Sequence, residues 1–356
     1  MKSKKRQSNF ELLRIISMFL IVLGHVTWQT HFKFPLNSPV KNTAIQSLWI
    51  GGEFGVWLFM LISAYFLSKT TFKRKRFFNT WRLTIFYSGA IYIFLILTKS
   101  VNFSLGGCIR SFFPVIMGSY WFVTSYLAVY LLSPFLNLLI DKLDKKRYQQ
   151  LICLLGIVFL VVPNVFRNTS LSTENVDGGG TVFILVIIYL IGGYFRKYSE
   201  DFTKKYMKSY IALFIISLLM MVASIYVINL LKNNNIGLFN HYRSYGLFLK
   251  VSSPLQAVCA CSFFLIFKNI DIKTNKLINS VASSTFAIYL IHTQIILFPI
   301  LWGKLICLQK YEWSKYIVFI EFVTALIVFI VCLTVDTIRK MLMKLIMRLK
   351  VVVKRS

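Results

Sequence analysis

Arg14 and His25 are the two residues whose types and spacing most clearly suggest chemistry. Eleven residues turn an α-helix through about 1100°, within roughly 20° of three full turns, so both side chains lie on one helix face, about 16 Å apart along the axis. Arginine is a permanent cation that suits phosphate groups, and histidine is a base that titrates near neutral pH. The alternative is that Arg14 extends to lipid phosphate and His25 bonds a backbone carbonyl.

Glu53 is the acid that we expect at about the depth of His25. It follows Gly51 and Gly52 near the start of a second apolar segment, so a histidine–carboxylate pair is possible across the first helical hairpin. Such a carboxylate would orient or charge the imidazole ring. The alternative is that Glu53 faces the outer water layer while the glycines serve close helix packing.

A few further residues inside apolar segments are candidates because ionisable groups there are costly and often functional. His292 lies in Tyr289-Leu290-Ile291-His292, and Glu321 lies two turns into the last segment. Each has a structural alternative, such as a neutral histidine ring bonded to a carbonyl. Ser63 ends an apolar and aromatic run, and Trp121 opens the fourth segment, where an interfacial aromatic belt is the simpler interpretation.

The elements that position these residues are transmembrane helices. The chain has 356 residues, 57% of them hydrophobic, with a mean hydropathy of +0.66, which is too apolar for a soluble domain of this length. A span needs about 20 apolar residues. We therefore predict an all-α integral membrane protein of about ten transmembrane helices, at residues 10–29, 48–68, 82–98, 119–140, 149–165, 181–195, 209–231, 245–267, 281–301 and 315–335.

The basic residues set the expected orientation. Of the 41 Lys and Arg residues, 29 lie in loops and ends on the side of the N-terminus, 10 lie on the other side, and Arg14 and Lys250 lie within spans. The positive-inside rule then places both termini in the cytoplasm. The net charge of +29 is thus explained by topology and contact with membrane lipids, without a nucleic-acid partner.

We expect one transmembrane domain over residues 1–340 and a basic cytoplasmic tail over 341–356. The first apolar segment is long and lacks a small-x-small cleavage site, so we interpret it as a retained anchor. The six cysteines have no metal-ligand spacing and no evident disulfide framework, and we predict no metal.

Several motifs occur in one order along most of the chain, and together the chain resembles the membrane-bound acyltransferase-3 family. They are Glu11-Leu12-Leu13-Arg14 with His25, then Gly55-Val56-x-Leu58-Phe59 and Ser63-x-Tyr65-Phe66, then Trp121-Phe122 leading to Tyr130-Leu131-Leu132-Ser133-Pro134, and finally Tyr289-Leu290-Ile291-His292.

The resemblance implies a ten-helix enzyme of the bacterial cytoplasmic membrane. Family members move an acyl group, commonly acetyl from acetyl-CoA, to a hydroxyl of a surface glycan such as O-antigen, exopolysaccharide, capsule or peptidoglycan. The family's Arg and His of the first helix correspond to Arg14 and His25, and Ala64 stands where Gly is usual after Ser63. The family's paired Arg motif is only loosely matched, by Arg74, Arg76 and Arg82.

The expected mechanism follows from these assignments. The phosphates of cytosolic acyl-CoA would meet the basic cluster that contains Arg74, Arg76 and Arg82, with Arg14 extending that path inward. His25 would remove the proton of an acceptor hydroxyl on a polysaccharide or its lipid-linked precursor. Direct transfer and a covalent acyl-enzyme both remain open, as do acetyl and succinyl as the acyl group.

Two other classes of protein also fit the sequence. A transporter or flippase for a glycan or lipid-linked intermediate would line its pathway with the same intramembrane charges. A non-catalytic scaffold for a polysaccharide synthase would tolerate substitution of Arg14 and His25. The sequence does not specify the acceptor sugar or the oligomeric state.

Overall fold

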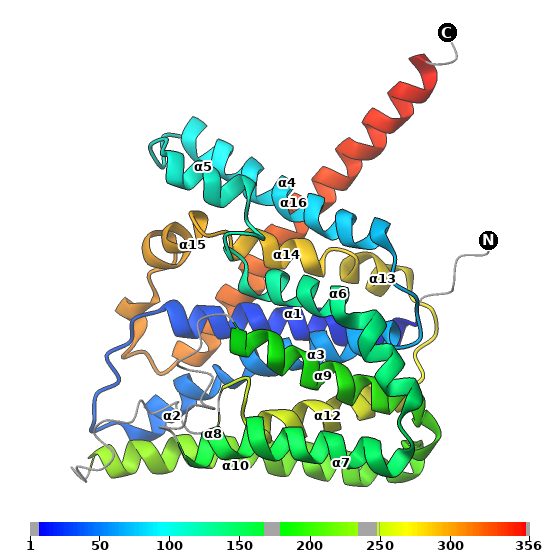
Figure 1. The fold of residues 1–356 in the computed structure, drawn as a ribbon. Helices are drawn as coiled ribbons and strands as arrows, with labels where there is room; N and C mark the ends of the chain where they lie inside the picture. The colour runs from blue at the N-terminus through cyan, green and yellow to red at the C-terminus, as the bar shows by residue number, and fades with distance from the viewer. Residues whose placement is uncertain (1–6, 167–178, 234–247, 249, 354–356) are drawn as a thin grey trace.

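The computed structural model describes residues 7–166, 179–233, 248 and 250–353, and the regular structure in these ranges is helical (Figure 1). Two π-helical segments, Ile157–Val161 and Leu301–Leu305, follow α7 and α15 directly. The α-helices are α1 (Ser8–Gln29), α2 (Pro39–Ser47), α3 (Ile50–Leu67), α4 (Arg74–Leu97), α5 (Leu105–Phe112), α6 (Trp121–Lys142), α7 (Lys145–Gly156), α8 (Val162–Val165), α9 (Gly179–Lys197), α10 (Met207–Asn233), α12 (Pro254–Asn269), α13 (Lys276–Ala282), α14 (Thr285–His292), α15 (Leu297–Ile300) and α16 (Ile317–Val353).

Small residues bring α1 and α3 into backbone contact at the centre of the protein. A Cβ atom on Gly24 would lie 2.6 Å from the Cα of Gly52, and one on Gly55 would lie 2.5 Å from the carbonyl oxygen of Ser17. Larger side chains at these positions would force the two helices apart. The glycines of the second predicted span thus serve close helix packing, as small residues commonly do in membranes.

The outer helices present apolar side chains on their surface. Leu219 on α10 is 60% exposed and Phe319 on α16 is 66% exposed, whereas Trp57 on α3 and Tyr189 on α9 are fully buried. Exposed apolar side chains on the outer helices around a packed interior suit a lipid environment, in which each helix satisfies its own backbone hydrogen bonds.

Seven helices within the described ranges are long and apolar enough to cross a membrane, or up to eight if a bent pair counts as one span. The seven coincide with the predicted first to fifth, seventh and tenth spans. The sixth predicted span is α9, a helix of 19 residues that lies between α3 and α6. The eighth corresponds to α12, which has only 16 residues, while 245–247 and 249 at its predicted start lie outside the described residues.

The ninth predicted span, 281–301, is not one continuous helix. The helical stretches Lys276–His292 and Leu297–Tyr311 meet at an angle of 83°. The buried Gln294 explains the break, because its Oε1 accepts hydrogen bonds from the backbone N–H groups of Ile296 and Leu297, at 2.8 and 2.7 Å. The Gln294 side chain thus caps a new helix at a point where hydropathy alone predicts that the ninth span continues as one helix.

The last helix continues past residue 340, where we expected the tail to begin. α16 ends at Val353, and its C-terminal part stands clear of the other helices (Figure 1). The buried Asp336 holds it to the body of the protein. Its carboxylate accepts hydrogen bonds from Tyr87 on α4, at 2.5 Å, and from Arg339, and it forms an ion pair with Lys340.

Candidate active site

His25 is hydrogen-bonded to His292, a residue 267 positions away in the chain. His25 Nδ1 lies 3.1 Å from His292 Nε2, and His292 Nδ1 lies 2.6 Å from the carbonyl oxygen of Ile288. A carbonyl oxygen only accepts, so His292 Nδ1 carries a proton and donates it. In the neutral ring, His292 Nε2 is then the acceptor and His25 Nδ1 the donor. This chain leaves Nε2 of a neutral His25 without a proton, as a general base requires.

The broken ninth span holds His292 in this orientation. His292 is the last residue of α14 and is fully buried, and Trp302 Nε1 donates a hydrogen bond of 3.3 Å to its carbonyl oxygen. The rings of Phe298 and Trp302 also lie against His25, with centroid distances of 5.7 and 6.4 Å. The 83° bend thus brings the segment after His292 back onto the histidine pair.

His25 lines a cavity of about 320 Å³, called here the His25 pocket. Glu53 and Trp121 line the same pocket, so three of the predicted site residues lie together. Glu53 Oε2 is buried without a hydrogen-bond partner, and within the described ranges no hydrogen bond joins Glu53 to His25. The structure therefore gives His25 a different partner from the one we expected. The lining is Ile21, Gly24, His25, Trp28, Gln29, Trp49, Gly52, Glu53, Val56, Trp121, Thr181, Val251 and Tyr289.

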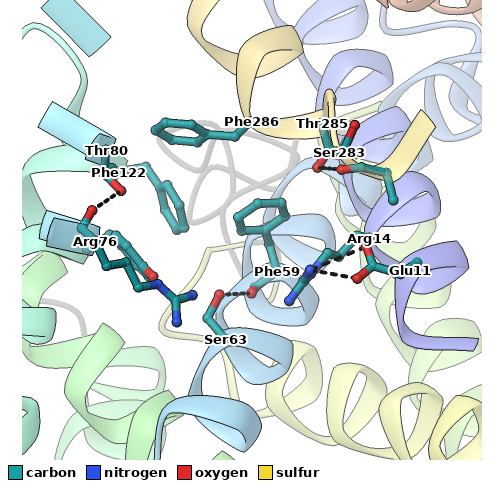
Figure 2. Close-up of a pocket in the computed structure, with 12 residues that line it drawn as sticks. Glu11, Arg14, Phe59, Ser63, Arg76, Thr80, Phe122, Ser283, Thr285 and Phe286 are labelled. Atoms are coloured by element: carbon teal, nitrogen blue, oxygen red, sulfur yellow. Dashed lines mark hydrogen bonds and ion pairs between the residues drawn. The ribbon is translucent and has the colours of Figure 1, made fainter. Parts of the chain in front are cut away.

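Arg14 lines a second cavity, of about 290 Å³, called here the Arg14 pocket (Figure 2). Arg14 Nη1 forms an ion pair with Glu11, at 3.2 and 3.3 Å from its two carboxyl oxygens. Arg76 enters the pocket from the opposite side, above the ring of Tyr130. The remaining polar groups of the lining are hydroxyls: Ser63, Thr80, Tyr126, Ser283 and Thr285.

A contact between aromatic rings connects the walls of the two pockets. Phe59 and Phe122 line the Arg14 pocket, and Tyr289 lines the His25 pocket. The ring centroid of Phe122 lies 5.8 Å from that of Phe59 and 5.9 Å from that of Tyr289. The linings of the two cavities are therefore joined by three aromatic rings in contact.

Four predicted site residues are not among the described residues that line either pocket: His292, which reaches the site through its hydrogen bond to His25, and Arg74, Arg82 and Glu321. Arg82 donates hydrogen bonds to Phe78 and Asn79 on its own helix, and Arg74 is exposed at the start of α4. Glu321 is fully buried on α16, and neither carboxyl oxygen has a hydrogen-bond partner in the described part of the chain.

Two features of the site were not predicted from the sequence. The role of Glu11 was detectable, because a spacing of three residues places it beside Arg14 on a helix. The pairing of His25 with His292 carries no local signal, since it depends on how α1 packs against α14. In the described ranges, no group of three or more His, Cys, Asp or Glu residues could hold a metal ion.

Comparison with known proteins identifies the family. A family model described as an acyltransferase domain matches residues 7–338, nearly the whole chain. No curated protein and no solved structure shows a significant match. The motifs that carry the resemblance lie on the helices that build the two pockets, and several helices are long enough to span a membrane. The chain belongs to the acyltransferase-3 family and is a multi-pass membrane acyltransferase.

Proposed function

We propose that this protein transfers an acyl group, acetyl in the simplest case, from cytosolic acyl-CoA to a hydroxyl of a cell-envelope or exported polysaccharide. It would act in the bacterial cytoplasmic membrane, with ten spans and both termini in the cytoplasm, as the distribution of Lys and Arg favours. The main support is the hydrogen-bonded chain from Ile288 through His292 to His25, which leaves a basic nitrogen on a residue that lines a pocket.

The Arg14 pocket is the proposed donor site. Arg14 and Arg76 lie on opposite sides of the pocket, and guanidinium groups bind phosphate oxygens in bidentate geometry. Glu11 holds Arg14 by an ion pair, which fixes the direction of the guanidinium group. The same helix carries His25 about 16 Å further along its axis, so a thioester on a long arm would approach the base.

The proposed reaction conserves protons and leaving groups. His25 Nε2 accepts the proton of the acceptor hydroxyl as its oxygen attacks the thioester carbonyl carbon. The carbon–sulfur bond then breaks, and the CoA thiolate takes the proton from His25, which returns to its neutral form. Transfer through an acylated side chain fits the same base, because either route needs a hydroxyl deprotonated at His25.

Glu53 has a different proposed role from the one that we expected. Its buried Oε2 has no hydrogen-bond partner among the residues that the structure describes, while His292 already sets the tautomer of His25. A ligand hydroxyl in the His25 pocket would supply that missing partner. We propose that Glu53 orients the acceptor sugar.

A sided transfer assay tests the function. Inside-out membrane vesicles would receive acetyl-CoA with a radiolabelled acetyl group outside, and envelope polysaccharide stripped of its esters by mild base would be trapped inside. We expect base-labile label on the polysaccharide with wild-type protein and none with His25→Ala. Lys310→Ala, which changes an exposed residue, is the matched control. Equal labelling by His25→Ala at equal protein level would disprove the catalytic role.

The broken ninth span also fits a transporter, because broken helices often form substrate sites in transporters. The same vesicles separate the two functions. A transporter would move labelled glycan in the absence of acetyl-CoA. Any effect of Arg14→Ala on that movement would not depend on acetyl-CoA. An acyltransferase would form the ester with no glycan movement.

A further inference from the structure

A third cavity lies beside the His25 pocket and shares three of its lining residues. It has a volume of about 500 Å³ and is called here the Trp28 pocket. Trp28, Gln29 and Trp49 line both cavities, so a ligand held in one could extend into the other. The nine lining residues are Thr27, Trp28, Gln29, Thr30, His31, Phe32, Phe34, Gln46 and Trp49.

The chemistry of this lining differs from that of the Arg14 pocket. The described residues that line it include no Asp, Glu, Lys or Arg, so the pocket offers no fixed charge to a phosphate or a nucleotide. The indole rings of Trp28 and Trp49 lie 3.9 Å apart between centroids, and Trp28 is 37% exposed. Aromatic faces beside amide and hydroxyl groups suit a neutral ligand that has apolar and hydroxyl-bearing sides, which describes a sugar ring.

Two sets of hydrogen bonds hold the walls of the pocket in place. Glu312 Oε1 accepts hydrogen bonds from the backbone N–H groups of Lys33 and Phe34, at 2.8 and 2.9 Å. Asn229 Nδ2 donates a hydrogen bond of 2.8 Å to Gln46 Oε1. Because the amide oxygen of Gln46 is thus engaged, its NH₂ group is the part that would donate to a ligand.

We propose that the Trp28 pocket binds a second sugar unit of the acceptor, next to the unit whose hydroxyl lies at His25. This inference rests on the proposed function, because it assumes that the His25 pocket takes a sugar. The enzyme would then prefer a glycan chain over a single sugar, since only a chain fills both cavities.

A binding measurement in the inactive His25→Ala protein tests the pocket apart from catalysis. The probes are a tetrasaccharide fraction of the base-treated envelope polysaccharide and the monosaccharides from its complete acid hydrolysis, titrated by calorimetry into protein in nanodiscs. We expect the tetrasaccharide to bind at least about tenfold more tightly than any monosaccharide. Adding Trp28→Ala should remove most of that difference, as expected for the loss of one aromatic contact.

Control variants keep the result interpretable. Trp313→Ala removes a tryptophan that is 66% exposed and outside the pocket, and it should leave tetrasaccharide affinity unchanged. Gln29→Ala changes a partly exposed residue at the end of α1 and should weaken tetrasaccharide binding by about threefold, even if Trp28→Ala fails to fold. Unchanged acetyl-CoA affinity verifies the fold of each variant.

The outcomes for the pocket and for the function are distinct. Equal affinity for tetrasaccharide and monosaccharide, or no effect of either pocket variant, would overturn the sugar subsite while acetyl transfer stands. Trp28-dependent tetrasaccharide binding without any acetyl transfer by wild-type protein would overturn the proposed function and leave the subsite intact.

Discussion

The Arg14 pocket and the His25 pocket lie along one helix, but they are built from different kinds of group. The Arg14 pocket has three charged residues, Glu11, Arg14 and Arg76, and its other polar groups are hydroxyls. The His25 pocket has one carboxyl group, a half-buried histidine and several aromatic rings. The difference fits the proposed function, in which one end of α1 would hold the charged donor and the other end would move a proton.

The largest expected effect comes from removing the base. His25→Gln should lower kcat by about 10²- to 10⁴-fold, the usual contribution of general acid–base catalysis. Acetyl-CoA affinity should not change, because Arg14 and Arg76 are untouched. Steady-state kinetics together with direct donor binding checks both parts. A parallel loss of donor affinity would contradict the proposal that donor binding and proton transfer belong to different pockets.

A smaller effect is expected from the residue that sets the tautomer of His25. His292→Leu should lower kcat by about 10²-fold, because an unpartnered His25 can carry its proton on either nitrogen. His292→Gln should recover part of the activity, since an amide oxygen can still accept from His25 Nδ1. A merely structural role for His292 would make both variants equally poor at equal melting temperature.

The donor side is tested by Arg14→Ala. The loss of a hydrogen bond to a charged group costs about 1.5–3 kcal/mol, so the Kd for acetyl-CoA should rise by about 10- to 150-fold. Arg14→Lys should fall in between, because a lysine keeps the charge without the bidentate geometry. Wild-type affinity in Arg14→Ala would remove Arg14 from the donor site.

The smallest effects distinguish the three arginines of α4. Arg76 lines the Arg14 pocket, whereas Arg82 bonds to neighbouring groups on its own helix. Arg76→Ala should raise the Kd for acetyl-CoA by about tenfold, while Arg74→Ala and Arg82→Ala should change it by less than about twofold. Donor titration of the three variants side by side would show whether the pocket or the whole basic cluster binds CoA.

The sequence was informative wherever local periodicity decides the structure. Helix geometry places Arg14 and His25 on one face of α1, and in the structure each of them lines a cavity. The expected depth of Glu53 was also useful, because Glu53 and His25 line one pocket. Hydropathy identified seven of the ten predicted spans as long apolar helices.

The features that the sequence did not predict depend on single side chains acting at long range. The bend in the ninth span comes from Gln294, whose side-chain amide oxygen accepts hydrogen bonds at the start of the next helix. The apolar composition of the segment does not indicate these hydrogen bonds. The pairing of His25 with His292 arises only when α14 packs beside α1. The helical period of the sequence cannot tell whether His292 or Glu53 is the partner of His25, because both residues are compatible with the depth of His25 in the membrane.

The contact of Phe59, Phe122 and Tyr289 bears on the membrane potential of the cell. An elementary charge that crosses a membrane potential of 100 mV releases about 2.3 kcal/mol, so an enzyme with cavities toward both faces must not let ions pass. In the proposed arrangement the three rings, which contact one another between the linings of the two cavities, would keep water and ions from passing from one cavity to the other. In the proposed reaction the acyl group moves to the acceptor oxygen while the hydroxyl proton leaves with the CoA thiol. This exchange moves no net charge, so the modification of the envelope would proceed without discharging the membrane.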